Sequence, residues 1–569
     1  MSDAGTGGAR PIFAERVRAR AGDPHLALLF EDDRWTYEEW VRACSARAAL
    51  FAAMRIDGPP HIGVLLDNVP DFTMWAGAAA LCGATIVGVN PTRRGEGLER
   101  DIRHTECQLV VTEGRHLALL EGLDLGAVGR DRVLVVDERP YLEALAPYHD
   151  APLPTTPIAP SDQIFLLFTS GTTGAPKAVV CSQERLERVA TTMAATMHLG
   201  PDDVTYASMP MFHSNALFTA WGPTVAAGAT LALRRRFSAS AFLPDVRKFG
   251  ATYFNYVGKP LAYILATPAR PDDADNPLQR GFGNEGNEAD VRRFAERFGC
   301  PLTDGYGQTE TGASISRVPG TPVGSLGKGT DAVKVLDPET GEECPPARFD
   351  ADGKLLNAEE AIGEIVNLAA QGFEGYWKND DAMRERYRDG AYWTGDLAYR
   401  DADGFFYFAG RTADWIRVDG ENFAAAPVER ILLRWTPVVL PAVYAVPDVE
   451  LGDRVMAALQ LAPGAVFDPA EFAAFLESQP DLGTKWAPAF VRIVERLPVT
   501  ETTKVLKREL VRERWDVDDP LWWRPGRGSA YVPFTPADAA ALRDRFAAAG
   551  RAHVLETSGR EAGPERPGA

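Results

Sequence analysis

Cysteine is scarce in this sequence, and the six cysteines that are present show no metal-binding pattern. They stand at positions 44, 82, 107, 181, 300 and 344, without Cys-x-x-Cys spacing and without nearby pairs of histidines. This arrangement argues against a structural zinc site. We expect reduced, mostly buried thiols in a cytoplasmic protein.

Long hydrophobic runs are also missing. The most apolar stretches, residues 75–89 and 438–446, are shorter than the roughly 18 uninterrupted apolar residues that a membrane span needs. Residues 1–10 are rich in Gly and Ala and lack the apolar core of a signal peptide. We therefore expect neither secretion nor a transmembrane segment, although peripheral contact with a membrane stays open.

Positive charge is in deficit, with 60 basic against 79 acidic residues and a net charge of −19. This balance argues against a general nucleic-acid binder, which needs clustered Lys and Arg. Only ten of the basic residues are lysine, so a lysine within a motif is more informative than usual; Lys177, Lys328 and Lys504 are such cases. The length of 569 residues predicts at least two domains. The oligomeric state cannot be read from the sequence.

What the sequence does contain is a loop suited to phosphate. Residues 168–177 read Phe-Thr-Ser-Gly-Thr-Thr-Gly-Ala-Pro-Lys and follow the apolar run 164–167, which predicts a buried strand. Glycines allow backbone N–H groups to approach an anion, hydroxyls add donors, and Lys177 adds a mobile positive charge. A Walker A loop is excluded because Pro176 precedes the lysine and Ala178 follows it. The alternative is a solvated turn between two strands.

Strand-length apolar runs alternate with segments of helical period through the first four hundred residues, which predicts an α/β fold. Residues 62–66, 72–82 and 85–89 predict a βαβ unit. Residues 288–298 predict an amphipathic helix. Further on, we expect strands at 363–368, 391–399, 405–408, 438–446 and 455–461, and helices at 427–435 and 469–478.

Five further motifs follow the phosphate loop. They are Pro-Met-Phe-His-Ser-Asn at 210–215, Asp-Gly-Tyr-Gly-Gln-Thr-Glu-Thr at 304–311, Tyr-Trp-Thr-Gly-Asp-Leu at 392–397, Gly-Arg-Thr-Ala-Asp at 410–414, and Pro-Val-Thr-Glu-Thr-Thr-Lys at 498–504. Together the six motifs resemble, in their expected order, the adenylate-forming superfamily of acyl-CoA synthetases, adenylation domains and luciferases. Residues 256–261, 283–286 and 418–423 resemble its branch of fatty-acid transport proteins and very-long-chain acyl-CoA synthetases.

The resemblance implies a large multi-layer N-terminal adenylation domain, a small α+β C-terminal lid domain, and ATP, Mg²⁺ and coenzyme A as cofactor and co-substrates. We place the adenylation domain at residues 1–412 and the lid at 413–555. The tail, 556–569, is rich in Gly, Pro and charge and is expected to be disordered.

The resemblance also assigns roles to residues of the large domain. It implies that Thr309 contacts the α-phosphate, that Glu310 binds Mg²⁺, and that Tyr306 stacks on adenine. An ionised carboxylate at Asp396 can accept two hydrogen bonds from the ribose diol. The phosphate loop would hold the β- and γ-phosphates through Thr169, Ser170, Gly171, Thr172, Thr173, Gly174 and Lys177, and the adenine edge would meet Gly283, Asn284 and Glu285.

In the C-terminal motifs, the resemblance implies that Lys504 swings in from the lid to stabilise charge during adenylation. A solvent-exposed basic helix start is the alternative, because Lys507 and Arg508 follow it. Arg411 would reach ribose or phosphate oxygens. Gly420 would line the path of the pantetheine thiol, or else serve as a turn glycine. The hinge has Ala413 where many relatives have Asp or Lys.

The acid substrate is expected to lack an amino group, because residues 212–215 contain no carboxylate that could pair with an ammonium. We count His213 with Lys504, Thr309 and Glu310 among the catalytic candidates; a hydrogen-bonded core histidine is the alternative. The function we predict is ATP-dependent conversion of a long-chain fatty acid, or a steroid side-chain carboxylic acid, to its CoA thioester with release of AMP and pyrophosphate. The rivals are an acyl-AMP ligase that loads a carrier protein and a protein that traps fatty acids during uptake.

Overall fold

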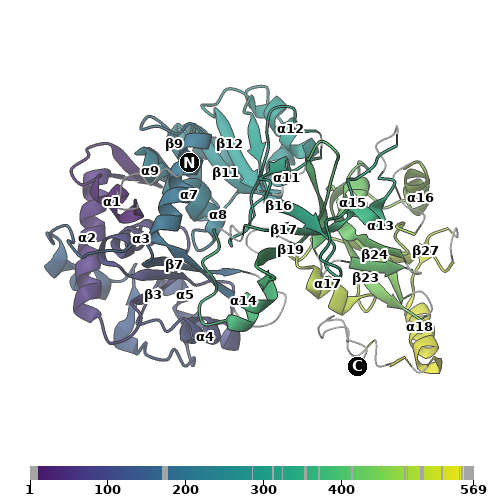
Figure 1. Ribbon diagram of the computed structural model, residues 1–569, viewed down its shortest axis with the longest axis horizontal. Coiled ribbons are helices and arrows are strands. Elements are labelled where there is room, and N and C mark those ends of the chain that lie inside the picture. The colour runs from purple at the N-terminus through teal and green to yellow at the C-terminus, as the bar shows by residue number, and fades with distance from the viewer. Residues whose placement is uncertain are drawn as a thin grey trace, which may run out of the picture. The chain divides into compact units, whose positions relative to one another are not determined.

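The structure is a computed structural model of the chain (Figure 1). It describes residues 11–169, 177–284, 286, 288–310, 313–322, 324–350, 355–369, 372–411, 415–418, 421–449, 452–479, 482, 485–499, 505–526, 530–549, 551–552 and 555. The chain divides into two compact units. The first consists of Met1–Gly312 and Gln371–Glu385, and the second of Ala313–Ala370 and Arg386–Ala569.

The predicted βαβ unit forms the centre of one sheet in the first unit. β3 (His61–Leu65) and β4 (Thr85–Gly88) pair in parallel, with α3 (Pro70–Cys82) as the crossover. Every residue of both strands is buried, as is typical of parallel strands covered on both faces. The prediction is confirmed.

This sheet has six strands in the order β6-β5-β3-β4-β7-β8. Its neighbours pair in parallel except β7 and β8, which form an antiparallel hairpin. The other four strands are β5 (Leu109–Thr112), β6 (Val133–Val135), β7 (Gln163–Thr169) and β8 (Lys177–Ser182).

A second sheet of seven strands has the order β13-β12-β11-β9-β10-β1-β2 and is parallel apart from the β1–β2 hairpin. Its strands are β1 (Leu26–Phe30), β2 (Asp33–Thr36), β9 (Val204–Ala207), β10 (Thr230–Leu233), β11 (Tyr253–Val257), β12 (Arg280–Asn284) and β13 (Leu302–Asp304). α12 (Glu288–Phe298) has the predicted bounds and leads into β13.

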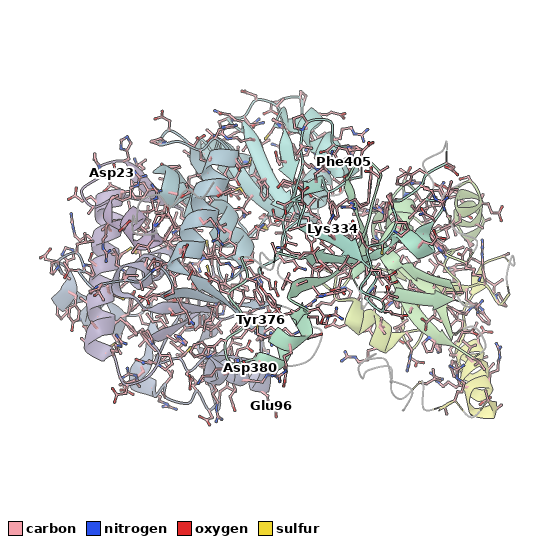
Figure 2. The ribbon with its side chains drawn as sticks, viewed as in Figure 1. Asp23, Glu96, Lys334, Tyr376, Asp380 and Phe405 are labelled. Atoms are coloured by element: carbon pink, nitrogen blue, oxygen red, sulfur yellow. The ribbon has the colours of Figure 1, made fainter. Side chains whose placement is uncertain are left out.

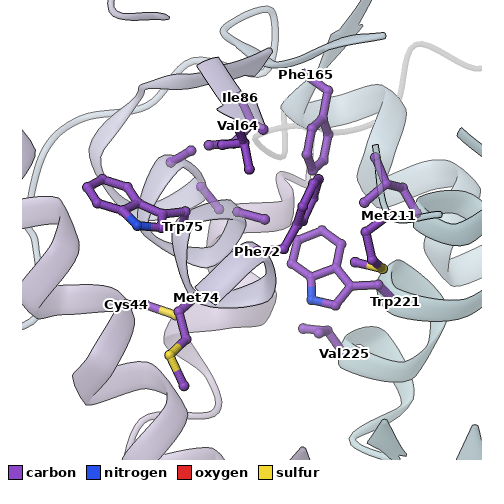
Figure 3. Packing of buried hydrophobic residues seen from close by; sticks show 14 of the residues in the cluster. Cys44, Val64, Phe72, Met74, Trp75, Ile86, Phe165, Met211, Trp221 and Val225 are labelled. Atoms are coloured by element: carbon purple, nitrogen blue, oxygen red, sulfur yellow. The ribbon is translucent and has the colours of Figure 1, made fainter. Parts of the chain in front are cut away.

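Helices fill the space between these two sheets. α7 (Gln183–Thr196) packs on β7, α9 (Gly222–Ala227) packs on β10, and the two helices pack on each other. α2 (Tyr37–Met54) and α3 form a second such pair. Figure 3 shows the buried cluster between them, where Trp221 meets Phe165 edge-on at 5.9 Å. This layered core confirms the predicted multi-layer α/β architecture.

The second unit contains an antiparallel sheet in which the predicted strands of the middle region are neighbours. Its order is β16-β17-β19-β18, with β20 also paired to β19. The strands are β16 (Val333–Leu336), β17 (Gly363–Asn367), β18 (Tyr387–Arg388), β19 (Ala391–Arg400) and β20 (Phe406–Arg411). A small separate pair joins β14 (Ile315–Ser316) and β15 (Lys328–Gly329).

The other large sheet of this unit is buried on both faces. Along β24 (Gly452–Leu461), Val455, Ala457 and Leu459 belong to one hydrophobic cluster, whereas Met456 and Ala458 belong to another. This alternation follows from the two-residue period of a strand. α15 (Ala425–Leu432) and α16 (Pro469–Glu477) contribute to the first cluster, and α17 (Lys507–Glu513) and α18 (Pro536–Ala548) contribute to the second.

The remaining strands of this sheet are β21 (Trp415–Val418), β22 (Glu421–Ala424), β23 (Val438–Asp448), β25 (Phe490–Val494), β26 (Leu521–Trp523) and β27 (Val532–Pro533). The helices and strands predicted between residues 427 and 478 are thus confirmed. The predicted boundary between 412 and 413, and the tail 556–569, fall on residues outside the described part of the chain, so both stay predictions.

The expectation of reduced, mostly buried thiols is met in the described residues. All six cysteines are free thiols, and four of them are buried. Burial raises the pKa of Cys82 to about 11 and that of Cys107 to about 12, so these thiols are unreactive at neutral pH. Among the described helices, none has the length and apolarity to cross a membrane.

Candidate active site

The predicted phosphate loop connects two strands of a hairpin. Thr169 ends β7, Lys177 begins β8, and the two residues face each other in the β-ladder. The loop residues Ser170, Gly171, Thr172, Thr173 and Gly174 lie outside the described residues. The described parts therefore fix both ends of the loop at the carboxyl edge of β7, where ligands of α/β sheets bind.

Lys177 is buried and ion-paired. Its Nζ lies 2.8 Å from Glu385 Oε2 and 5.9 Å from the centre of the Tyr376 ring, and only 3% of the residue is exposed. A lysine ammonium is a compact charge that can exchange one anionic partner for another. Because Glu385 is half exposed, a phosphate oxygen can compete with it for the ammonium.

Thr309 and Glu310 are held by side chains from other segments of the first unit. The Thr309 hydroxyl lies 2.8 Å from Ser214 Oγ, and Tyr376 Oη donates to Glu310 Oε1 at 2.8 Å. Figure 2 labels Tyr376, which precedes α14 (Asp380–Arg386). Because the Tyr376 hydroxyl binds Oε1 of Glu310, the second carboxylate oxygen of Glu310 can serve as a metal ligand.

A buried arginine also hydrogen-bonds to the backbone at Thr309. Arg185, on α7, is fully buried and donates to the carbonyl oxygens of Val180, at 2.5 Å, and Thr309. Burying a guanidinium is costly unless its N–H groups are hydrogen-bonded. Arg185 thus connects the end of the phosphate-loop hairpin with the Thr309 backbone.

Three asparagines form a chain of hydrogen bonds beside His213. Asn255 Nδ2 donates to Asn215 Oδ1 at 2.7 Å, Asn215 Nδ2 donates to Asn284 Oδ1 at 3.2 Å, and Asn284 Nδ2 donates to the carbonyl of Gly305 at 2.6 Å. The chain joins α8 (Ser214–Ala216), β11 and β12 to the Tyr306 motif. All three side chains are neutral.

The glycine before Asn284 is required by packing. A Cβ on Gly283 would lie 2.2 Å from the Tyr256 ring. Tyr256 is fully buried, and its hydroxyl donates to Asp304 Oδ2 at 3.0 Å; the same oxygen accepts the amide of Gly286 at 2.8 Å. Tyr256 therefore packs against the segment 283–286, which was predicted to contact adenine.

Asp396 belongs to the second unit, at the middle of β19. It is 6% exposed, and its amide donates to Thr394 Oγ1 at 3.1 Å. Asp396 on β19 is paired with Arg411 on β20 in the β-ladder. The two residues predicted to contact ribose therefore lie opposite each other on neighbouring strands.

The turn before Asp396 depends on Glu364. Gly395 has φ +74°, and its amide donates to Glu364 Oε1 at 2.6 Å. Burial raises the pKa of Glu364, against the Gly395 amide and the Arg388 guanidinium, which act to lower it. Glu364 was not identified from the sequence, because nothing local marks it as the partner of a turn 31 residues away.

Of the other predicted site residues, His213 and Tyr306 are half-buried. The His213 ring lies 4.3 Å from that of Phe212. Within the first unit, the structure brings Thr309 close to Ser214 and Asn215 close to Asn284.

Glu285, Gly420 and Lys504 lie outside the described residues, as does the Arg411 side chain. Sequence reasoning missed Tyr376, Glu385 and Arg185, whose roles depend on contacts between distant segments.

One other group of side chains has metal-binding chemistry. Ligand atoms of Asp67, Glu113 and His116, all buried, lie within 4.8 Å of one another. Three guanidinium groups already pair with these carboxylates, those of Arg115, Arg235 and Arg236. Burial acts to raise the pKa of Asp67, but hydrogen bonds from His116 and Arg236 outweigh it and hold this pKa well below its ordinary value. Because a divalent cation would be repelled by these arginines, we interpret the group as an ion-pair cluster.

A predicted phosphate loop at the carboxyl edge of a layered α/β unit, followed by an antiparallel sheet and a second sheet that is buried on both faces, is typical of adenylate-forming enzymes. The model of the family described as "AMP-binding enzyme" matches residues 13–377, and the chain belongs to this family.

Two relatives that match over nearly their full length are named as a CoA synthetase and a CoA ligase. The chain is 51% identical to the steroid-22-oyl-CoA synthetase of Rhodococcus jostii (strain RHA1), over 96% of this chain and 99% of that protein. It is 48% identical to the medium/long-chain-fatty-acid–CoA ligase FadD17 of Mycobacterium marinum (strain ATCC BAA-535 / M), over 89% of this chain and 96% of that protein. The superfamily and its fatty-acid branch, predicted from the motifs, are confirmed.

A solved structure supports the fold. The anthranilate CoA ligase AuaEII in complex with anthranoyl-AMP matches with a TM-score of 0.77 and 21% identity, over 88% of this chain and 97% of that one. The protein is therefore an AMP-forming acid–CoA ligase whose substrates are a small carboxylic acid, ATP and CoA.

Enzymes of this class use Mg²⁺, and the described residues fit it. Glu310 supplies a single carboxylate, oriented by the Tyr376 hydroxyl. One carboxylate is sufficient for Mg²⁺, which takes its other ligands from phosphate and water. The ion would supply positive charge against the phosphates.

Proposed function

We propose that this protein converts a steroid side-chain carboxylic acid to its CoA thioester, in the cytoplasm. The observation that carries this proposal is the 51% identity to a steroid-22-oyl-CoA synthetase over nearly the full length of both chains. The cytoplasmic part is supported by six free thiols.

The surroundings of His213 agree with a substrate that has no amino group. In the described part of the chain, the side chains of Ser214 and Asn215 hydrogen-bond to the Thr309 hydroxyl and to the amides of Asn255 and Asn284, all of which are uncharged. An ammonium group beside these residues would lose water of hydration, and residues 212–215 include no carboxylate that could pair with it instead. A carboxylic acid with an apolar body avoids that cost.

For the reaction, we propose that the phosphate loop with Lys177 binds the β- and γ-phosphates, that Thr309 contacts the α-phosphate, and that Asp396 and Arg411 hold the ribose. A substrate carboxylate oxygen attacks the α-phosphorus, and pyrophosphate leaves. Lys504 would stabilise the charge of that step. The CoA thiolate, passing Gly420, then attacks the acyl carbon and displaces AMP.

A second candidate substrate is a medium- or long-chain fatty acid. It is favoured by the 48% identity to a medium/long-chain-fatty-acid–CoA ligase. Both substrates combine a carboxylate with an apolar body, so the residues around His213 suit either one.

A panel of acids tests the choice. The purified protein is given ATP, Mg²⁺, CoA and one acid at a time, namely a steroid with a carboxylate at carbon 22, octanoate, palmitate or benzoate. We expect kcat/KM for the steroid acid to exceed that for both fatty acids by about tenfold or more, a difference of ~1.4 kcal/mol in transition-state binding. A preference for octanoate or palmitate would replace the proposal by the second candidate.

A further inference from the structure

The segment 209–213, which leads to His213, is fixed from the opposite sheet at two points. It follows β9 of the seven-stranded sheet, yet one polar and one steric restraint on it come from the loop after β3 and from β4 of the six-stranded sheet. Neither restraint belongs to a motif that was recognised in the sequence.

The first restraint is the amide of Asn68. Its Nδ2 donates to the carbonyl of Met209 at 2.9 Å, and its Oδ1 accepts the amide of Met211 at 2.8 Å. Nδ2 also donates to the carbonyl of Arg234 at 3.1 Å. Asn68 is 3% exposed, so water cannot replace these bonds cheaply. One side chain thus holds the backbone on both sides of Pro210.

The second restraint is the absence of a side chain at Gly88. A Cβ at this position would lie 2.6 Å from the carbonyl oxygen of Phe212. Gly88 ends β4, with Val64 of β3 and Leu167 of β7 as its ladder partners. The colliding atom is a backbone carbonyl oxygen and not the end of a flexible side chain. A residue with a Cβ at position 88 would therefore have to displace the Phe212 peptide.

The ion-pair cluster lies next to Asn68 in the chain and strengthens the same connection. Asp67 pairs with Arg236 at 3.1 Å, and Arg236 lies two residues after Arg234, whose carbonyl Asn68 binds. The loop after β3 is therefore attached to the end of β10 by charges and to the segment 209–213 by neutral hydrogen bonds.

We propose that Asn68 and Gly88 are positioning residues for acid binding, because they set the place of the Phe212 peptide and of the His213 side chain that follows it. The proposal rests on the proposed function, in which this segment borders the acyl group. In the described part of the chain, the Asn68 side chain hydrogen-bonds to residues 209, 211 and 234, and Gly88 meets the phosphate-loop strand β7 at Leu167, two residues before its end. The neighbouring Ser214 and Asn215 have anchors of their own in Thr309 and Asn284, so we expect ATP binding to be preserved.

Two substitutions and two matched controls test this. Asn68→Leu removes the three hydrogen bonds and puts an apolar side chain of similar size in place of the amide. Its control is Gln108→Met, because Gln108 is also buried and also bridges a backbone amide and a carbonyl, those of Ile56 and Pro59, at the other end of the sheet. Gly88→Ala is matched by Gly63→Ala on β3, where the new Cβ would meet the side chains of Cys107 and Val110 at 3.1 and 3.3 Å.

We expect Asn68→Leu and Gly88→Ala to raise KM for the acid on the order of tenfold or more, with KM for ATP within about twofold of the parent. The two controls should leave both KM values near the parental ones. A second readout does not need turnover: hydrogen exchange of the Met211 amide should be at least about tenfold faster in Asn68→Leu than in the parent and in Gln108→Met.

The outcomes are separable. If the parent forms acyl-CoA and Asn68→Leu leaves the acid KM unchanged, or raises the KM values of acid and ATP equally, the positioning role is wrong. It is also wrong if Gln108→Met raises the acid KM as much, or if Met211 exchange is unchanged. If the parent forms no acyl-CoA with any acid while Met211 exchange accelerates as expected, the proposed function fails and the structural restraint stands.

Discussion

Lys177 shows how a motif residue can be recognised in the sequence while its partner is not. The loop 168–177 indicated a cation for phosphate, and the structure places that cation against Glu385, from a segment 208 residues away. Likewise, the sequence singled out Thr309 and Glu310 but not Arg185 or Tyr376. Motif residues are visible because their chemistry is local. Their supporting contacts are set by which distant segments meet, and no spacing in the sequence encodes this.

Lys504→Ala tests the residue assigned to the charge of the first step. We expect adenylation, measured as acid-dependent exchange of pyrophosphate into ATP, to fall by about 10²-fold or more, as for loss of a charge-stabilising donor from a dry site. Thioester formation from supplied acyl-adenylate should stay near the parental rate. The control is Lys507→Ala, since Lys507 also belongs to the predicted lid and pairs with Glu429 at 2.9 Å. It should change neither step by more than about twofold. Equal loss in both steps for Lys504→Ala would indicate a folding defect.

At the scale of elements, those with a clear hydrophobic period were predicted well. α12 has the predicted bounds because its charged and apolar residues alternate with helical period. The helical turn Leu217–Trp221, by contrast, is buried on all sides, so it offers no polar face for a period to reveal. Its five residues adopt the wider geometry of a π-helix. This geometry depends on packing and not on helix propensity.

α4 (Gly95–His104) carries a carboxylate that opposes folding at neutral pH. Asp101 is fully buried beside Arg93, at 2.9 Å, and burial raises its pKa to about 6. The unfolded value is roughly 3.9, so the folded state binds more protons between about pH 4 and 6. Stability contributed by Asp101 is therefore present at low pH and is lost as pH rises through that window.

Asp101→Asn should remove this dependence. We expect the free energy of unfolding at pH 7.5, measured by urea denaturation, to rise by ~1–3 kcal/mol over the parent, with a smaller gain at pH 5. Asp124→Asn, at an exposed carboxylate paired with Arg103, should change it by less than about 0.5 kcal/mol. A loss of stability in Asp101→Asn that is the same at both pH values would contradict the account.

For the whole molecule, the order of strands and helices was predictable but their grouping was not. The segment Gln371–Glu385 belongs to the first compact unit, although the chain on both sides of it belongs to the second. Its attachment comes from Glu374 to Ser182, Tyr376 to Glu310, and Trp377 to His104. These bonds connect residues that are 66 to 273 positions apart, and a linear pattern does not reveal them.

The central claim is that one chain activates its acid as an acyl-adenylate and then passes the acyl group to CoA. The most direct measurement is the fate of carboxylate oxygen, followed by mass spectrometry with a substrate labelled with ¹⁸O in both carboxylate positions. Attack of the carboxylate on the α-phosphorus predicts acyl-CoA, pyrophosphate without label, and AMP carrying one ¹⁸O in its phosphoryl group. Label in inorganic phosphate together with ADP, or AMP without label, would contradict the account.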